Sequence, residues 1–323
     1  MSIMDQFSVV AFPWGQDIIT VDRLVDVARH AEALEFHSVN VPFVNVSLTD
    51  DHLFASIDNN HILEPLVVMT AMIVATRTIR ICSDAFPLPL LPPYHWAKAV
   101  AVMDQMSGGR IIAGFCLGIG KAQFEAYGVS LKNRGRRGDE QLEIITRLWT
   151  EDAVTHVGEH YTLTEMTCEP KPLQKPCPPI WWAGRERSIA RAARYAECFD
   201  PFVPTFDELR NVYAPGLAKE CEKWGTKTRL GAWIYCTITP GREMSGEEIN
   251  AHFAGTYFLD RPELPQEVAM AGSPAQCAAK IREYEDAGLS QFILDFQQHG
   301  MKSPAESMAQ MTLFREQVVP LLQ

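Results

Sequence analysis

The sequence predicts an α/β protein that folds as one (β/α)8 barrel over residues 1–323, with insertions at the rim where the strands end. About eight short apolar runs each precede a helical pattern. These runs lack the polar alternation of half-exposed strands, which favours a parallel sheet buried on both faces. No Pro-, Ser- or Gly-rich linker divides the chain. Eight such units over about 250 residues fit a barrel, and a doubly wound open sheet is the alternative.

The first half of the chain gives four strand-and-helix units. Thr20 is the expected N-cap of the first helix, because its hydroxyl can accept from a backbone N–H of the first turn. The third strand runs into a proline-rich exit that keeps the backbone extended. The expected strands are 7–12, 37–42, 79–86 and 110–118, and the expected helices are 20–36, 64–77, 94–107 and 138–150.

The second half repeats the alternation after an interruption at 151–178, which reads as a small hairpin and a proline-stiffened connection. The polar and aromatic segment 240–272 reads as a long insertion at one rim. Ser273 and Pro274 are typical of a helix start. The expected strands are 179–184, 198–203, 229–240 and 291–296, and the expected helices are 185–197, 273–288 and 303–321.

The composition is that of a globular protein, with 47% hydrophobic and 21% charged residues and a net charge of −11. Because nucleic-acid binding needs clustered Lys and Arg, this balance argues against a polynucleotide partner. The one basic cluster, "KNRGRR" at 132–137, is local and fits a single phosphate group better.

Eight cysteines are scattered without a CxxC pair or zinc-ligand spacing, so no metal site is expected. We interpret them as reduced thiols, which favours a cytoplasmic location. The amino-terminal segment has no basic stretch before its short apolar run, and no window of about 20 apolar residues predicts a membrane span.

Polar residues and glycines gather where three of the expected strands end. Ser83 and Asp84 close the third strand, whereas Gly118 follows the fourth in "GFCLGIG". Gly184 follows the strand 179–184 and opens a turn with Arg185 and Ser188, where free N–H groups and a helix dipole favour a phosphate. In a (β/α)8 barrel, strand ends of this kind carry the active site. Tight turns and a solvated helix face explain the same residues without a ligand.

Several blocks together resemble the bacterial luciferase-like flavin oxidoreductases. They are "DQMSGGRIIAGFCLGIGKAQFEAYGV", "RGRRGDEQLEIITRLWT", "VTHVGEHYTL", "KPLQKPCPPIWWAGRERSIARAARYAE" and the tail "GSPAQCAAKIREYEDAGLSQFIL". The likeness covers nearly the whole chain, in order, from "FSVVAFPWG" onward. It implies a (β/α)8 barrel that binds reduced FMN, or alternatively a deazaflavin, at the carboxyl-terminal rim.

The resemblance also implies roles for individual residues. It implies a non-prolyl cis peptide under the flavin ring between Asp84 and Ala85, beside Ser83. Gly118 would border the ring. Pro13, Trp14 and Phe43 would face the substrate. The phosphate contacts would be Arg110, Arg136, Gly184, Arg185 and Ser188.

One departure from the family pattern concerns the catalytic acid–base pair. Many relatives carry an Asp-His or His-His pair just after the second strand, but here that place reads "VPFVNV", with Phe43 and Val44. His52 lies eight residues later and is the candidate catalytic residue, with His61 as a weaker one. The alternative is that His52 is an ordinary histidine of a surface loop with no catalytic role.

These observations lead to three functional hypotheses. The first is a two-component monooxygenase that receives reduced FMN from a flavin reductase and uses O2 on a small apolar organic substrate. The second is a deazaflavin-dependent dehydrogenase or reductase on the same barrel. The third is a flavin-binding protein without turnover of its own. A homodimer through helices of the second and third units is expected, because 64–77 is apolar on all sides.

Overall fold

The computed structural model describes residues 2–15, 19–43, 61–254, 261–298 and 302–323. Eight strands form the central sheet. They are β1 (Phe7–Val10), β2 (Ser38–Pro42), β3 (Arg80–Asp84), β5 (Ile111–Cys116), β8 (Ile180–Ala183), β9 (Cys198–Asp200), β10 (Arg229–Ile238) and β12 (Gln291–Asp295). Each pairs in parallel with the next, and β12 pairs with β1, so the ring is closed. The expected (β/α)8 barrel is confirmed, and the open sheet is excluded because β9 pairs with β10.

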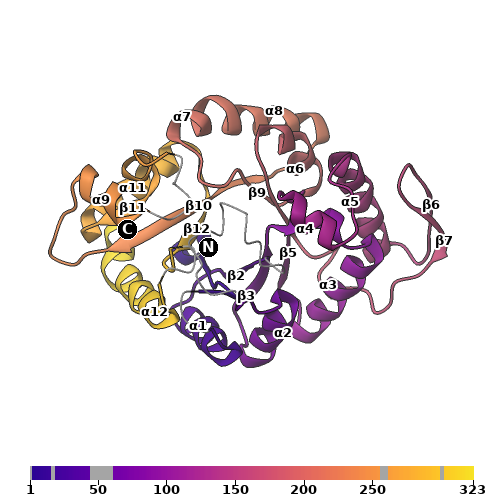
Figure 1. Cartoon of the computed structure of the whole chain (residues 1–323), viewed down its shortest axis with the longest axis horizontal. Coiled ribbons are helices and arrows are strands. Elements are labelled where there is room, and N and C mark those ends of the chain that lie inside the picture. Colours follow the sequence, from indigo (N-terminus) through magenta and orange to yellow (C-terminus); the bar gives the residue numbers. More distant parts are fainter. Residues whose placement is uncertain (1, 16–18, 44–60, 255–260, 299–301) are drawn as a thin grey trace.

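Helices surround this ring (Figure 1). The helices are α1 (Val21–Ala33), α2 (Pro65–Ala75), α3 (Pro93–Ser107), α4 (Lys121–Ala126), α5 (Arg134–Thr150), α6 (Ile189–Tyr195), α7 (Phe206–Glu208), α8 (Ala214–Trp224), α9 (Gly246–His252), α10 (Pro265–Val268), α11 (Pro274–Asp286) and α12 (Pro304–Leu313). Within the parts of the chain that the structure describes, no helix has both the length and the apolar character needed to cross a membrane.

Side-chain caps fix several helix starts where the sequence predicts them. The Thr20 hydroxyl accepts from the Arg23 N–H at the start of α1. Ser273 and Ser303 each form a capping box, with Gln276 and Glu306 respectively. A capping residue satisfies backbone donors that have no partner inside the helix, and it therefore sets the first residue of the helix.

Helix α8 is absent from the expected elements, although it fills the gap between β9 and β10. Pro215 stands inside the helical pattern at 206–224, and it obscures the signal because proline normally interrupts a helix. In the structure Pro215 lies in the first turn of α8, directly after a π-helical turn at Leu209–Tyr213. At that position its missing N–H does little harm.

The two interruptions of the barrel have different structures. Residues 151–178 contain the expected hairpin, with β6 (Val154–Val157) antiparallel to β7 (Thr162–Met166). Glu140 of α5 holds its turn by accepting from the N–H groups of His160 and Tyr161. Residues 240–272 contain α9, α10 and a strand, β11 (Met270–Gly272), which extends the sheet beside β10.

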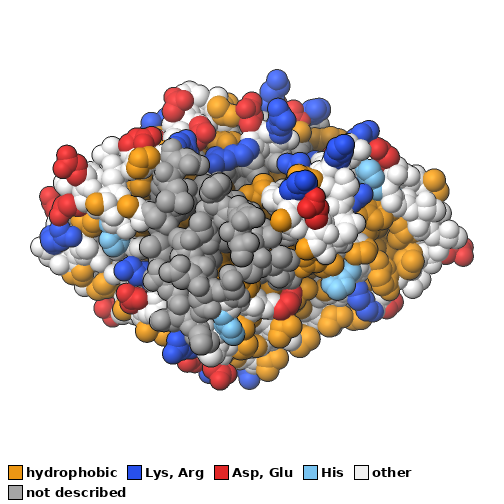
Figure 2. All heavy atoms as spheres, in the orientation of Figure 1, with side chains coloured by type: hydrophobic (Ala, Val, Ile, Leu, Met, Phe, Trp, Pro, Cys, Tyr) orange, Lys and Arg blue, Asp and Glu red, His pale blue; other side chains and the backbone are white. Residues whose placement is uncertain are grey.

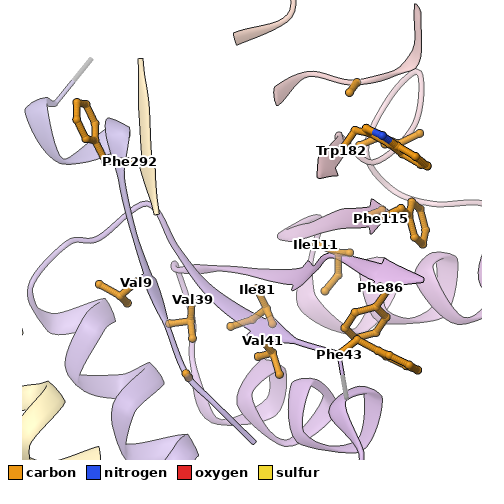
Figure 3. Close-up of a cluster of buried hydrophobic side chains, with 14 of the residues drawn as sticks. Val9, Val39, Val41, Phe43, Ile81, Phe86, Ile111, Phe115, Trp182 and Phe292 are labelled. Carbon is orange, nitrogen blue, oxygen red and sulfur yellow. The ribbon is translucent and has the colours of Figure 1, made fainter. Parts of the chain in front are cut away.

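The core has two layers that follow from strand alternation. One layer packs between the strands and the helices, and Figure 3 shows part of it, with Val39, Ile81 and Phe115 from neighbouring strands. The other layer lies inside the ring. It includes Val10, Cys82, Ile112, Trp181, Cys198, Trp233, Tyr235 and Ile293. Because successive side chains of a strand point to opposite faces, residues two positions after these also point into the ring.

Candidate functional site

Most of the predicted site residues lie at one end of the barrel, which we call the mouth. It is the end where the parallel strands finish. Ser83, Asp84 and Ala85 close β3, and Gly118 follows β5. Gly184, Arg185 and Ser188 follow β8. The closed parallel ring therefore brings together residues that lie about 100 positions apart in the sequence.

The end of β3 is clamped to β5 by Ser83. Its hydroxyl accepts from the Gly114 N–H at 2.8 Å and donates to the Gly114 carbonyl at 3.2 Å. A Cβ on Gly114 would collide with the Ser83 carbonyl oxygen, so only glycine permits this approach. Beyond the clamp the chain turns at Ala85 and re-pairs with β5 through β4 (Phe86–Pro87).

The expected cis peptide between Asp84 and Ala85 is wrong. Among the described residues the cis bonds precede Pro170 and Pro176. Ala85 instead has a φ of 54°, which is unfavourable for a residue with a side chain. The Cys116 thiol donates to the Ala85 carbonyl at 2.9 Å and helps to hold this turn.

Two glycine turns follow the next two strands of the ring, β5 and β8. Gly118 has a φ of 73°, and a Cβ there would lie 2.8 Å from the Pro87 Cβ and 3.0 Å from the Phe124 ring. A Cβ on Gly184 would collide with the Ser188 hydroxyl. In both turns only glycine allows the neighbouring groups to approach the backbone so closely.

Arg185 extends from the Gly184 turn and acts on two neighbours. Its guanidinium hydrogen-bonds to the Tyr213 hydroxyl, and its charge opposes the raised pKa of Asp200. The Ser188 N–H donates to the Arg185 carbonyl at 2.7 Å, and the Ser188 side chain is buried. The turn therefore holds one exposed cation above a buried carboxyl.

Arg110 lies at the other end of the barrel, so its expected phosphate contact is wrong. It directly precedes β5, and its guanidinium donates to carbonyls of Ile73 and Thr76 at the end of α2. It also donates to the carbonyls of Ile79 and Ser107. These bonds satisfy carbonyls that have no partner within the helix, and the role of Arg110 is structural.

Arg136 is directed toward the hairpin rather than toward the barrel. It is exposed, pairs with Glu159 at 3.2 Å and donates to the Asn133 side chain. Arg134, two residues earlier, lies nearer the mouth, since its charge acts on the Cys116 thiol at the end of β5. The Nε of Arg134 is buried and has no hydrogen-bond partner. Figure 2 shows further Lys and Arg side chains over α5, α6 and α8.

The two predicted substrate-facing aromatics lie in different layers. Trp14 belongs to the cluster inside the ring and packs on Phe12 with ring centroids 4.8 Å apart. Phe43 packs on Phe86 at 4.6 Å and on Trp96, in the layer between strands and helices (Figure 3). Trp14 thus lies inside the ring, and its contact with a substrate stays a prediction, whereas Phe43 supports the barrel wall.

Sequence reasoning missed several polar residues that point into the ring near the mouth. Asp200 and Asp295 lie two residues beyond Cys198 and Ile293 of the inner cluster, and Asn40 donates to Asp84 at 3.3 Å. Gln297 accepts from the Phe12 N–H at 3.0 Å. The sequence signal was available, because Asp200 and Asp295 end apolar strands as Asp84 does.

Some buried polar atoms of the mouth lack a partner within the described chain. They are Oδ2 of Asp200 and Nε2 of Gln297. A buried polar group without a partner costs free energy, and such groups are satisfied in most folded proteins. The mouth therefore presents donors and acceptors suited to a bound polar molecule.

Burial raises the pKa values of two mouth carboxyls. The pKa of Asp84 rises to about 7 because it is buried and faces the charge of Asp200, and the Asn40 hydrogen bond opposes this rise. Burial also raises the pKa of Asp200 to about 6, although backbone N–H groups of Phe202 and Trp233 oppose it. Two buried carboxyls thus titrate near neutral pH, as is common at functional sites.

The candidate histidines divide between described and undescribed parts. His52 lies outside the described residues. The His61 ring nitrogen contacts the Ile19 carbonyl at 3.1 Å. His252 of α9 contacts Gln298, just after β12. Within the described ranges no group of three or more His, Cys, Asp or Glu side chains could hold a metal ion.

The fold and the mouth define a (β/α)8-barrel protein with buried polar groups at the carboxyl ends of its strands. Comparison with protein families shows to which family the chain belongs. Residues 6–260 match the model described as "Luciferase-like monooxygenase", and the chain belongs to this family. Its flavin-dependent members place the chain among the oxidoreductases.

Two named relatives match parts of the chain. One is the FMNH2-dependent dimethylsulfone monooxygenase of Pseudomonas putida, 33% identical over 134 residues, which are 41% of this chain and 36% of that protein. The other is the oxygenase component of the flavin-dependent trigonelline monooxygenase of Acinetobacter baylyi, 30% identical over 238 residues, which are 68% of this chain and 66% of that protein. The chain thus matches less than two thirds of the length of either.

Solved structures show the same fold at low sequence identity. The monooxygenase RslO1 of Streptomyces bottropensis superposes with a TM-score of 0.79 at 21% identity, covering 98% of this chain and 100% of that one. An F420-dependent secondary alcohol dehydrogenase superposes with a TM-score of 0.79 at 18% identity, covering 98% and 99%. The oxygenating constituent of 3,6-diketocamphane monooxygenase from Pseudomonas putida, solved in complex with FMN, superposes with a TM-score of 0.78 at 15% identity, covering 98% and 99%. Solved structures named for FMN and for F420 thus share this barrel.

Proposed function

We propose that the chain is the oxygenase of a two-component monooxygenase, which receives reduced FMN from a separate reductase and oxidises a small apolar organic substrate with O2. The observation that carries the proposal is the pair of unpartnered polar atoms within an aromatic mouth, at Asp200 and Gln297. The names of the two relatives, one FMNH2-dependent and one an oxygenase component, support the same reading.

The residues of the mouth fit such a cofactor. Arg185, Ser188 and the Gly184 turn would hold the phosphate, with Arg134 as a second cation. We keep the Ala85 turn and Gly118 as the positions that would border the flat ring. When bound, reduced FMN supplies the electrons that activate O2.

The chain's own contribution is to exclude water and to hold protons. Phe12, Trp14 and Trp233 pack edge to face inside the ring, and Trp233 lies 5.4 Å from the Phe202 ring. Such an apolar wall suits an apolar substrate and keeps solvent from a reactive site. We keep His52 as the proposed catalytic residue.

Anaerobic titration with reduced FMN, and separately with reduced deazaflavin, tests the proposal. We expect micromolar binding of reduced FMN, followed by oxygen uptake when air is admitted. Binding of the deazaflavin alone would replace the proposal with a deazaflavin-dependent dehydrogenase or reductase. Binding without oxygen uptake, or no binding, would leave a non-catalytic role.

A homodimer and a cytoplasmic location complete the proposal. On α2, Val67 and Val74 are each 62% exposed and lie two turns apart on one helix face. Such apolar exposure is typical of an interface. We expect sedimentation velocity to give a dimer, and the double variant V67K/V74K to give a monomer. All eight cysteines are free, which favours a reducing compartment.

A further inference from the structure

Three buried aspartates end strands of the ring and point into the barrel just below the mouth. Asp84, Asp200 and Asp295 are 5%, 5% and 0% exposed. Each lies two residues after a member of the inner cluster, namely Cys82, Cys198 and Ile293. The barrel interior therefore concentrates carboxyl groups where solvent is scarce.

The three carboxyls differ in how many donors they receive. Asp200 Oδ1 accepts from the N–H groups of Phe202 at 2.7 Å and Trp233 at 3.3 Å. Asp295 Oδ2 accepts from the Trp233 indole at 3.3 Å. Asp84 Oδ2 accepts from Asn40 at 3.3 Å. With one long neutral hydrogen bond, Asp84 has less support for a negative charge than Asp200, whose charge it also faces.

A second observation is that this region holds buried polar atoms without a hydrogen-bond partner. Oδ2 of Asp200 is buried and has no hydrogen-bond partner, although Oδ1 of the same carboxylate accepts two N–H groups. Nε2 of Gln297 is likewise buried without a partner. Both side chains are at least nine-tenths buried.

The charged and titratable groups around Asp84 come from three strands, one helix and the turn after β8. Cys82 belongs to its own strand, β3, and Cys116 to the neighbouring β5; both thiols feel the Asp84 charge. Across the ring, β9 contributes Cys198 and Asp200. Two cations act on the neighbours of Asp84. Arg134 of α5 acts on Cys116, and Arg185 acts on Asp200.

We propose that Asp84 is the proton-holding residue of the mouth, and that binding of reduced FMN takes up one proton at this carboxyl. This inference rests on the proposed function. A reduced flavin brings negative charge from its phosphate, and from its ring once N1 has lost a proton. An ionised Asp84 would repel it inside a low-dielectric barrel, whereas a protonated Asp84 can donate a hydrogen bond. The proton comes from water and binds to a carboxylate oxygen of Asp84, so no bond of the flavin changes.

The test is the dissociation constant of reduced FMN, measured anaerobically from pH 6 to pH 9 for the wild type and D84N. The side chain of D84N has the same shape, can still accept from Asn40 and holds no charge. We expect wild-type binding to weaken by about tenfold per pH unit above about pH 7, relative to D84N. Because the flavin titrates identically with both proteins, its own pH dependence cancels in the ratio.

A matched control removes an exposed carboxyl of the same type. Asp286 is exposed in the last turn of α11, far from the mouth in sequence and fold. D286N should keep the wild-type pH dependence. The dissociation constants of reduced FMN for the wild type and D286N should then agree within twofold from pH 6 to pH 9.

A second variant keeps the inference testable if D84N does not fold. D200N removes the facing charge and should lower the pKa of Asp84, so weakening of FMN binding should begin at a lower pH than in the wild type. The inference would be overturned if D84N bound reduced FMN with the same pH dependence as the wild type. It would also be overturned if the weakening of binding began at the same pH in D200N as in the wild type. Either result would leave the proposed function intact. Failure of the wild type to bind reduced FMN at any pH would overturn both.

Discussion

The two ends of the barrel use the same residue types in opposite ways. At the amino-terminal end, Arg110 donates to carbonyls at the end of α2, and Glu32 accepts from the N–H groups of residues 77–79. Inside the ring at that end, an unbroken series of hydrogen bonds runs from Ser38 to Ser8, Gln291, Arg229 and Glu197. At the mouth, Asp200 and Gln297 retain unpartnered atoms.

This difference shows which charges belong to the fold and which are available to a ligand. A guanidinium that satisfies helix-end carbonyls has no donors left for a phosphate. A buried carboxylate with an unpartnered oxygen reduces the stability of the fold and is retained where a ligand can use it. Mutations at the two ends should therefore affect different quantities.

The largest effect is expected for Arg110 at the amino-terminal end. R110A leaves the Ile73 and Thr76 carbonyls without their donor, so we expect a loss of about 3 kcal/mol in the free energy of unfolding. Urea denaturation measures it. R77A removes an exposed arginine that donates at the same helix end and should cost less than about 1 kcal/mol. If R110A were as stable as the wild type and bound FMN more weakly, Arg110 would be a cofactor contact, as the sequence resemblance implied.

An intermediate effect is expected for His37, also at the amino-terminal end. Burial, with the charges of Arg80 and Arg229, lowers its pKa to about 3, and its ring stacks on Trp181. Because the unfolded chain binds a proton there below about pH 6.5, the wild type should lose about 2 kcal/mol of stability between pH 7 and pH 5. H37Q should not show this loss of stability, because glutamine does not bind a proton in this range. Equal acid sensitivity of both proteins in urea titrations would exclude His37 as its source.

The smallest effect is expected at the mouth, where affinity rather than stability should change. R134A should weaken reduced-FMN binding by about tenfold, since a charge-assisted hydrogen bond to phosphate contributes about 1.5 kcal/mol or more. R136A, which loses the exposed pair with Glu159 and a hydrogen bond to Asn133, should change affinity less than twofold. Both variants should melt near the wild-type temperature. A larger loss in R136A would restore the assignment that the sequence suggested.

Sequence reasoning predicted the barrel well because each strand and most helices carry local signals. Apolar runs marked every strand of the ring, and Thr20, Ser273 and Ser303 mark helix starts by their own hydrogen bonds. Helix α8 was not predicted because Pro215 interrupts its helical pattern. In the site, the positions of Ser83, Gly118 and Gly184 followed from the rule that parallel strands end together.

The sequence by itself determined the ring of strands, the glycine turns and the identity of the groups at each strand end, because these depend on neighbours within a few residues. Only the tertiary structure decided that Arg110 serves α2, that Phe43 lies outside the ring, and that Asp84 faces Asp200. Those outcomes depend on groups brought together from distant parts of the chain. Burial and the field of such neighbours set the pKa and the free donors of a side chain, and no local pattern records them.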